Sequence, residues 1–417
     1  MLQMIPLLAA LAVGDSLPVR PSLPPPPPSG SAEIATEARA KAVDMGASFA
    51  VHRQPAIPLV SVRMALLADD PAGYAGAGHL VQHLMLPTLR AQVERVGGEV
   101  EMERSADAVV YTLTGPAREL SYMAGLLESA LRPPAPTAAA LLIASRELAE
   151  ERLEEWESAD QHIRAALRTR LFPGDISAAG TERSATRFEP EEIPEIWRRM
   201  YDPDRISILA VGDVNLAELR EAFASLPAGA GSGSDEEAAD TISLAPLAPA
   251  EATRGWLGAG YLASDLEPAA VSVTARIIHD QLQDQLPDAA VATEHWWIHQ
   301  GQALVIVLGA PANQVAAARR ALNTLASGLD TRLTDRSVSE AARSLRREML
   351  FYARTPDRMA EVLGRFSDRS GDPDAADSFY ARLQEVDLDA VRGVLQHMVD
   401  HTPARVEIEA PRPKPAG

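Results

Sequence analysis

The sequence predicts an α+β protein made of two related halves. Short apolar or alternating segments, typical of strands, are mixed with longer segments whose apolar residues recur at helical spacing. The same order of segments starts again after residues 229–253, where Gly, Ser, acidic residues and Pro dominate as they do in linkers. The 417 residues are enough for two domains, each with its own core. Strands mixed with paired helices in each half favour two related α+β domains.

The chain is expected to divide into a tail, two domains and a linker. The boundaries are residues 1–31 for the tail, 32–228 for the first domain, 229–253 for the linker, 254–412 for the second domain and 413–417 for a short end. Within the tail, Pro24–Pro28 favours extended polyproline geometry and predicts a tether. Met1–Val13 has a short apolar core of the length found in signal peptides, without a preceding Lys or Arg. We therefore expect a periplasmic or secreted protein, with the cytoplasm as the alternative.

The first domain is expected to begin with a short helix at Ala32–Val43. Strands are expected at Ala47–His52, Leu59–Ala68, Ala108–Leu113 and Arg205–Val211. After the second of these strands glycines break the chain, a helix begins near His79, and Pro87 is expected to end it. Further helices are expected at Thr88–Val96, Glu119–Leu131, Thr137–Glu157, His162–Leu171, Glu191–Met200 and Leu216–Leu226.

The second domain repeats this mixture of strands and helices. Its strands are expected at Trp256–Leu262, Gln302–Leu308 and Arg405–Glu409. Its helices are expected at Pro268–Gln285, Val315–Leu325, Ser337–Phe351, Met359–Ser367 and Leu388–Val399.

Charge and composition exclude several classes of function. The formal net charge is −19 and the chain has no cysteine. Such an acidic surface repels nucleic acid and anionic lipid, so neither is expected as a partner. Disulfides and Cys-based zinc sites are excluded. No apolar run reaches the roughly 18–20 residues that a transmembrane helix needs.

A pair of histidines in the first domain has the spacing of a metal site. His79 and His83 are four residues apart on a predicted helix, so their imidazoles project from one face on successive turns. Imidazole is a favoured zinc ligand. A carboxylate usually stands beside such a pair as general base for the metal-bound water, but here Gln82 occupies the position. The segment therefore has the residues to hold a metal and lacks the group that would use it.

With this layout, the chain resembles the insulinase / mitochondrial-processing-peptidase family, the pitrilysin-like inverzincins. The family signature is His-x-x-Glu-His, with a Glu as third zinc ligand further along the chain. Five stretches resemble the family in order, over about residues 45–410. They are Gly76-Ala77-Gly78-His79, Gly97-Gly98 with Asp107 and Tyr111, Phe172-Pro173-Gly174 with Gly180-Thr181-Glu182, Tyr201-x-Pro203, and Val211-Gly212-Asp213.

The resemblance implies a fold, a metal and an activity. It implies two homologous half-domains, each a mostly antiparallel sheet flanked by helices, that together form half of a clamshell. It implies a zinc metalloendopeptidase with His79, His83 and Glu151 as ligands. The third ligand is left open among Glu147, Glu150, Glu151 and Glu154, which are close together on one predicted helix. The alternative is that this acidic run is only a solvent-exposed helix face.

Three departures from the family pattern indicate a degenerate member. Gln82 replaces the catalytic Glu, and a neutral amide is not a base. Glu101-Met102 and Arg104 stand where the family has Asn-Ala and Thr, on the strand expected to bind substrate backbone. The family's Arg-x6-Tyr pair is missing around residues 286–295. The resemblance then implies a non-catalytic subunit that forms a homo- or heterodimer with another family member around a peptide or protein substrate.

Two other functions stay open at this point. One is an active zinc metalloendopeptidase in which Glu101 or Glu103 replaces the missing base. The other is a structural subunit without metal. Two further histidine pairs, His295/His299 and His397/His401, are not expected to bind metal, and Trp256, Trp296 and Trp297 are expected in the core or at a subunit interface.

Overall fold

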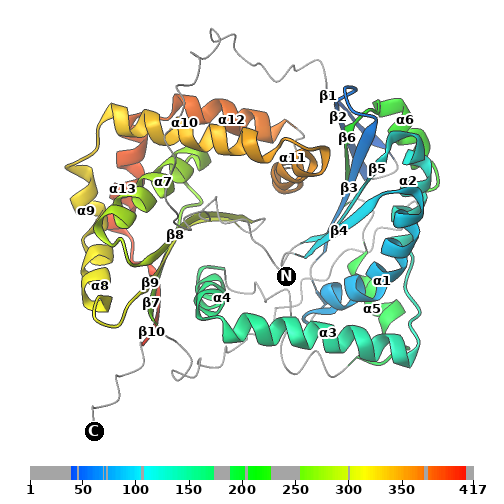
Figure 1. Ribbon diagram of the computed structural model, residues 1–417, viewed down its shortest axis with the longest axis horizontal. Coiled ribbons are helices and arrows are strands. Elements are labelled where there is room, and N and C mark those ends of the chain that lie inside the picture. Colours follow the sequence, from blue (N-terminus) through cyan, green and yellow to red (C-terminus); the bar gives the residue numbers. More distant parts are fainter. Residues whose placement is uncertain are drawn as a thin grey trace, which may run out of the picture.

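A computed structural model of the chain describes residues 39–44, 47–68, 70–71, 74–104, 108–172, 188–201, 205–226, 254–298, 301–370 and 374–409. The tail, the predicted linker and several of the matched sequence stretches, such as residues 173–187, lie outside the described residues. The described chain contains two β-sheets, each flanked by helices, which confirms the predicted α+β class (Figure 1). Within these residues, every helix is too short or too polar to cross a membrane.

The first sheet has six strands in the order β1-β2-β6-β3-β5-β4. Their bounds are β1 Arg39–Asp44, β2 Ala47–Arg53, β3 Leu59–Leu67, β4 Glu99–Arg104, β5 Ala108–Pro116 and β6 Ile206–Gly212. Neighbours are antiparallel except β2 and β6, which run parallel. The prediction of a helix at Ala32–Val43 is wrong for its described part, because residues 39–44 form strand β1 and pair with β2. This pairing overrides a weak local helix propensity.

The helices of the first half are α1 Ala77–Val93, α2 Leu120–Ala130, α3 Ala138–Glu157, α4 Ala159–Leu171, α5 Ile193–Met200 and α6 Leu216–Ala222, with 3₁₀ turns η2 Glu94–Val96 and η3 Ala117–Glu119. One expectation is wrong here, because Pro87 lies inside α1 and does not end it. Pro87 is exposed, so its ring lies on the outer side of α1, and the cost is limited to the one helical hydrogen bond that proline cannot donate. Leu89 and Val93 continue the apolar face beyond Pro87 and bury it in the first core, which keeps the helix intact.

The second sheet has four antiparallel strands in the order β10-β7-β9-β8. Its elements are β7 Gly255–Leu262, α7 Pro268–Gln285, β8 Ala290–Ile298, β9 Gly301–Ala310, α8 Val315–Asn323, α9 Leu325–Asp330, α10 Asp335–Tyr352, α11 Pro356–Ser370, α12 Ala375–Glu385, α13 Leu388–Asp400 and β10 Ala404–Ile408. Strand β8 and helix α12 were not anticipated from the sequence. The order β10-β7-β9-β8 repeats the order β6-β3-β5-β4 of the first sheet with the same antiparallel pairing, so the two halves share a topology.

Each half lends one helix to the sheet of the other (Figure 1). Helix α4 packs on β7, β9 and β10 of the second sheet, whereas α11 packs on β3 and β6 of the first. Gly258 and Gly260 make room for α4, because a Cβ on either would lie 2.8 Å or less from a leucine of that helix. On the other side, Ala360 and Leu363 of α11 join a buried cluster with strand β6. The two halves are therefore interlocked.

Ion pairs with buried carboxylates reinforce the packing of α11 on the first sheet and of α4 on the second sheet. Arg63 on β3 donates to Asp368 on α11 at 2.5 Å, and Ser207 of β6 donates to the same carboxylate at 2.7 Å. In the second half, Arg164 on α4 pairs with the buried Glu294 on β8. Because a charge that loses its partner inside a protein is costly, each pair ties its helix to its sheet.

Candidate metal centre

Helix α1 presents both histidines on one face near its N-terminus. The helix starts after Gly76, whose φ of 86° is a left-handed conformation that glycine adopts without strain. The rings of His79 and His83 lie on successive turns, with their centroids 4.8 Å apart. Among the described residues, His79 Nδ1 and His83 Nε2 are buried and have no hydrogen-bond partner. An unsatisfied buried imidazole nitrogen is costly in a protein interior, and a metal ion bound by His83 Nε2 would satisfy that atom.

Helix α3 packs along α1 and brings a carboxylate between the two imidazoles. Glu151 Oε2 lies 3.2 Å from His79 Nε2, and Glu151 Oε1 lies 3.6 Å from His83 Nε2. One ligand atom from each of His79, His83 and Glu151 lies within 4.8 Å of the others. Two imidazoles and one carboxylate are a donor set that suits zinc, and they leave a fourth position open. The residues present therefore fit the metal that the sequence predicts.

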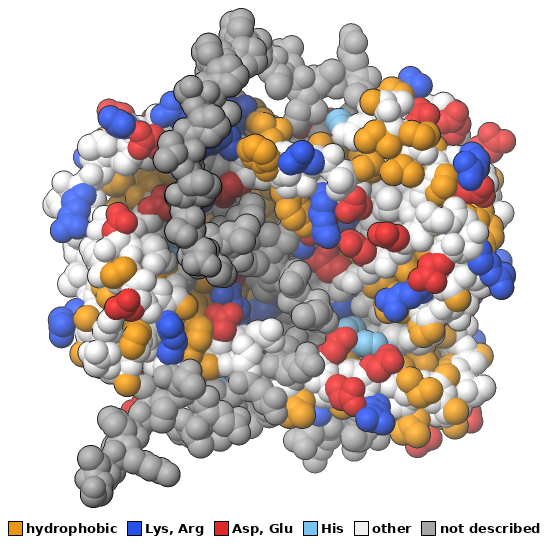
Figure 2. Space-filling view, in the orientation of Figure 1, with side chains coloured by type: hydrophobic (Ala, Val, Ile, Leu, Met, Phe, Trp, Pro, Cys, Tyr) orange, Lys and Arg blue, Asp and Glu red, His pale blue; other side chains and the backbone are white. Residues whose placement is uncertain are grey.

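The neighbouring acids on α3 have other contacts. Glu147 accepts a hydrogen bond from His83 Nδ1 at 3.1 Å, the arrangement in which a carboxylate orients a metal-binding imidazole from behind. Glu150 pairs with Arg146 in solvent at 2.8 Å. The side chain of Glu154 lies outside the described atoms. Of the described acids, Glu151 is the one between both rings and stays the predicted ligand. Figure 2 shows histidine side chains beside a group of Asp and Glu side chains where Figure 1 places α1 and α3.

The protonation states favour metal binding near neutral pH. Burial lowers the pKa of His79, although the hydrogen bond with Glu151 opposes this shift. The hydrogen bond from His79 is the largest cause that holds the pKa of Glu151 well below its usual range. At neutral pH His79 is therefore a neutral imidazole with a free lone pair, and Glu151 is an ionised carboxylate. Both are the forms that bind a metal ion.

The lowered pKa of His79 predicts a pH dependence for the metal-free protein. Because the unfolded chain binds this proton at its ordinary pKa of 6.5 and the folded chain binds it only at lower pH, stability falls as pH drops below 6.5. Urea unfolding of chelator-treated protein at pH 7.5 and pH 5.5 measures the difference. In His79→Gln the difference is expected to shrink. If the stability difference between the two pH values stayed the same in this variant, the lowered pKa of His79 would not be its cause.

Gln82 points away from solvent and into the edge of the first sheet. Its side chain is 2% exposed. Its Nε2 donates to the backbone carbonyl of Glu103 on β4 at 2.8 Å and lies 3.4 Å from that of Val110 on β5. An ionised carboxylate could not make either hydrogen bond, because both partners are acceptors. The amide therefore ties helix α1 to the β4–β5 hairpin.

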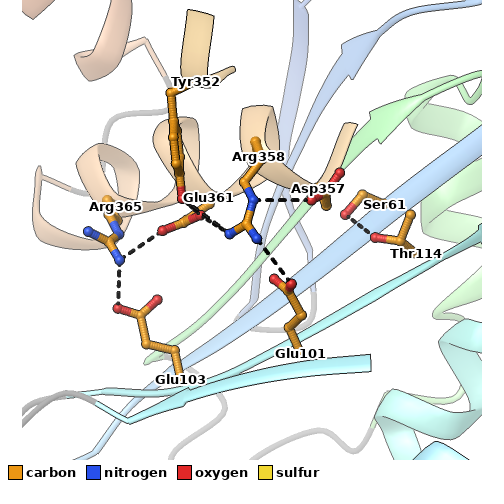
Figure 3. Close-up of polar contacts among 9 residues, drawn as sticks. All are labelled: Ser61, Glu101, Glu103, Thr114, Tyr352, Asp357, Arg358, Glu361 and Arg365. Carbon is orange, nitrogen blue, oxygen red and sulfur yellow. Dashed lines mark hydrogen bonds and ion pairs between the residues drawn. The ribbon is translucent and has the colours of Figure 1, made fainter. Parts of the chain in front are cut away.

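Within the part of the chain that the structure describes, strand β4 is an edge strand of the first sheet, and its side chains alternate between two faces. Met102 packs against the first core, under α1. Glu101 and Glu103 face α11 of the second half, where Glu101 pairs with Arg358 at 3.4 Å and Glu103 pairs with Arg365 at 3.1 Å (Figure 3). The two acids that could have replaced the missing base are thus in ion pairs on the face turned toward α11.

Sequence reasoning did not identify the α11 residues that face β4. Arg358, Glu361 and Arg365 lie along one face of α11, and Tyr352 at the end of α10 donates to Glu361 (Figure 3). The spacing of three and four residues between alternating charges is the signal that predicts one charged helix face. That signal does not indicate which element the face contacts.

The other histidines and the tryptophans considered in the sequence make hydrogen bonds or packing contacts within the fold. His295 lies between Ser272 and Gln302, with nitrogen–oxygen distances of 2.7 and 2.6 Å. Residue 299, the other histidine of this pair in the sequence, lies outside the described residues. His397 and His401 stack at the end of α13, where His397 Nε2 contacts the carbonyl of Leu262. Trp296 is buried, and Trp297 packs against phenylalanines of α11 and α12. Trp256 is partly buried against the apolar cluster that α4 forms with the second sheet.

Comparison with solved structures gives the fold its name. Residues of this chain superpose on a peptidase M16 inactive domain from Pseudomonas fluorescens with a TM-score of 0.73 and 14% identity, covering 90% of this chain and 98% of that one. A protease from Helicobacter pylori matches with a TM-score of 0.72 and 14% identity, covering 88% and 98%. This chain has the M16-like peptidase fold. The M16-like fold confirms the insulinase-type architecture that the sequence resemblance implied.

The M16-like fold also relates this chain to half of a longer protein. The first half of the periplasmic protease PqqL from Escherichia coli matches with a TM-score of 0.64 and 15% identity, covering 87% of this chain and 90% of that fragment. Against the complete PqqL, the match covers 46% of its length. No protein-family model matches the sequence, and no curated protein does. At these identities the comparisons establish the fold.

Proposed function

We propose that this chain is a non-catalytic subunit of the insulinase type, a pseudo-peptidase that keeps a metal site and lacks the base. The observation that carries the proposal is the position of Gln82. It occupies the general-base position, and its amide is hydrogen-bonded to backbone carbonyls of β4 and β5. A positioned acid–base group contributes roughly 10²–10⁴-fold to catalysis. Its loss from a metallohydrolase leaves little useful turnover.

The metal of this proposal is zinc, held by His79, His83 and Glu151. When bound, zinc supplies Lewis-acid polarisation of a carbonyl oxygen. The chain's own residues orient the site: Glu147 fixes the ring of His83 through Nδ1, and the hydrophobic contacts of α1 exclude water from its buried side. We infer that the site serves structure or substrate orientation in this chain, because the general-base position holds the neutral amide of Gln82.

Substrate contact is proposed along β4, at Glu101 and Met102. Among the described residues β4 is an edge strand with a strand partner on one side, and the edge of such a strand can pair with an extended peptide. Glu101 extends toward α11, so a peptide at this edge would meet charged groups from both halves. Peptides or unfolded protein segments are the substrate class that this geometry supports.

The proposal includes a partner and a compartment. Complete PqqL is about twice the length that this chain matches, which supports pairing of two such units. We infer a homodimer or a heterodimer with an active family member, in which this chain forms half of a clamshell. The description of PqqL as periplasmic supports the periplasmic or secreted location predicted from the N-terminus.

A peptide-cleavage assay tests the proposal. Zinc-loaded wild-type chain is expected to cleave a quenched fluorescent peptide library no faster than Glu151→Gln, because Gln82 occupies the general-base position in both proteins. The assay is repeated with a chelator. Turnover by the wild type that the chelator abolishes, and that Glu151→Gln lacks, would overturn the non-catalytic assignment.

A further inference from the structure

Asp70, which precedes the metal helix, binds the start of that helix in two places. Its Oδ2 accepts from the backbone N–H of Gly76 at 2.6 Å, and its Oδ1 accepts from the backbone N–H of Gly78 at 2.8 Å. Helix α1 has no capping side chain at its own N-cap position. The first N–H groups of a helix lack intrahelical partners, and a negative charge there is favourable. Asp70 therefore caps α1 from outside the helix, directly before His79.

Arg104 holds Asp70 in place from the end of β4. Its Nη2 donates to Asp70 Oδ1 at 3.0 Å, and its Nη1 donates to the backbone carbonyl of Ala68 at 3.2 Å. The side chains of Arg104 and Asp70 are 1% and 7% exposed. In such a buried environment each charge depends on the other, and the pair has a fixed geometry.

The guanidinium also lies against the first turn of α1 itself. A Cβ on Gly78 would lie 2.9 Å from Arg104 Nε, so only glycine lets the turn approach this closely. The preceding residue on β4, Glu103, accepts from Gln82 through its carbonyl. The first two turns of α1 are therefore fixed to the end of β4 by Asp70, Arg104 and Gln82.

We propose that Asp70 and Arg104 are positioning residues for the metal site. By capping and supporting the first turn of α1, they hold the His79 imidazole at the height where it meets Glu151 on α3. The inference rests on the proposed zinc site, because it concerns the placement of one of its ligands. It assigns a role to Arg104, a residue that otherwise stands out only as a departure from the family pattern.

A second buried pair in the same chain is a matched control. Arg63 and Asp368 are 3% and 7% exposed and join β3 to α11. Asp70→Ala and Asp368→Ala both remove a buried carboxylate from an arginine, so both lower global stability. Only Asp70 contacts the backbone of α1. A change in zinc affinity that appears in Asp70→Ala and is absent from Asp368→Ala therefore reports positioning.

Zinc affinity is measured by competition with a chromophoric chelator, at a temperature where circular dichroism shows each variant folded. Asp70→Ala is expected to weaken zinc binding by about 10–100-fold, as loss of a supporting group beyond the ligands does. Asp70→Asn keeps one acceptor oxygen and is expected to lie between Asp70→Ala and wild type. If Asp70→Ala does not fold, the zinc affinity of Asp70→Asn is compared with that of wild type and Asp368→Ala instead. Equal weakening in Asp70→Ala and Asp368→Ala, or none in either Asp70 variant, would overturn the proposal.

Amide hydrogen exchange of the metal-free proteins gives a readout that does not need zinc. Exchange in the first turn of α1 is expected to quicken by about 10-fold in Asp70→Ala relative to Asp368→Ala, because a helix cap is lost. If wild type binds no zinc, the proposed metal function fails while this experiment still decides the role of Asp70. Unchanged exchange at residues 78–80 would show that the pair does not hold the turn.

Discussion

Replacing Glu151 with Gln is expected to weaken zinc binding by more than about 100-fold, the upper range for loss of a group that only supports a ligand. The substitution keeps the shape of the side chain and removes the charge that lies 3.2 Å from His79 and 3.6 Å from His83. An amide is a poorer zinc ligand than an ionised carboxylate. Metal content after dialysis, together with chelator competition, measures the loss.

Glu150→Gln is the control for this experiment, because it makes the same charge change one residue away. Glu150 is 60% exposed and pairs with Arg146 in solvent. Its replacement is expected to leave zinc affinity within about 2-fold of wild type, because an exposed charge interacts weakly at a distance. Equal affinities for Glu151→Gln and wild type would remove Glu151 from the site. Equal losses in both variants would show a general effect of charge on α3.

Replacing Asp368 with Ala is expected to lower the free energy of unfolding by about 3–5 kcal/mol, the cost of leaving a buried charge without its partner. Arg63 is 3% exposed and donates to Asp368 at 2.5 Å, so it cannot reach water without moving α11. Ser207 loses its acceptor as well. Chemical unfolding at pH 7 measures the change.

Two comparisons sharpen the Asp368 result. Asp330→Ala removes the partner of Arg392 at a site where both side chains are about half exposed, 46% and 54%, and is expected to cost less than about 1 kcal/mol. The double variant Arg63→Met with Asp368→Leu is expected to recover most of the loss, because no buried charge remains. A loss below about 1 kcal/mol in Asp368→Ala would show that the exchange of α11 does not depend on this pair.

Local patterns predicted most of the elements that position the site. The helical spacing of apolar residues in α1 and α3, and the four-residue spacing of His79 and His83, are properties of short segments, so they could be read without knowing the fold. Placing Glu151 beside the histidines needed the family resemblance, because α1 and α3 are separated by two strands and a helix. The structure brings the three residues together.

The errors have a common cause, which is that tertiary contacts outweighed local signals. Residues 39–44 pair with β2 although their composition favours a helix. Pro87 stays within α1 because the buried residues after it keep the helix packed. Strand β8 contains the His295-Trp296-Trp297 run, and its alternation of burial appears only once β9 pairs with it. The contacts of Arg358 and Arg365 with β4 depend on the exchange of α11 between the halves.

A crystal structure of the zinc-loaded chain, with anomalous scattering at the zinc edge, tests the central claim most directly. We expect one zinc ion within about 2.0–2.2 Å of His79, His83 and Glu151, as in other zinc sites. We also expect the Gln82 amide to remain on the carbonyls of β4 and β5, with no second carboxylate facing the open side of the metal. A second carboxylate, from Glu103 or Glu147, within hydrogen-bond distance of the open coordination position would contradict the claim that this metal site lacks a base.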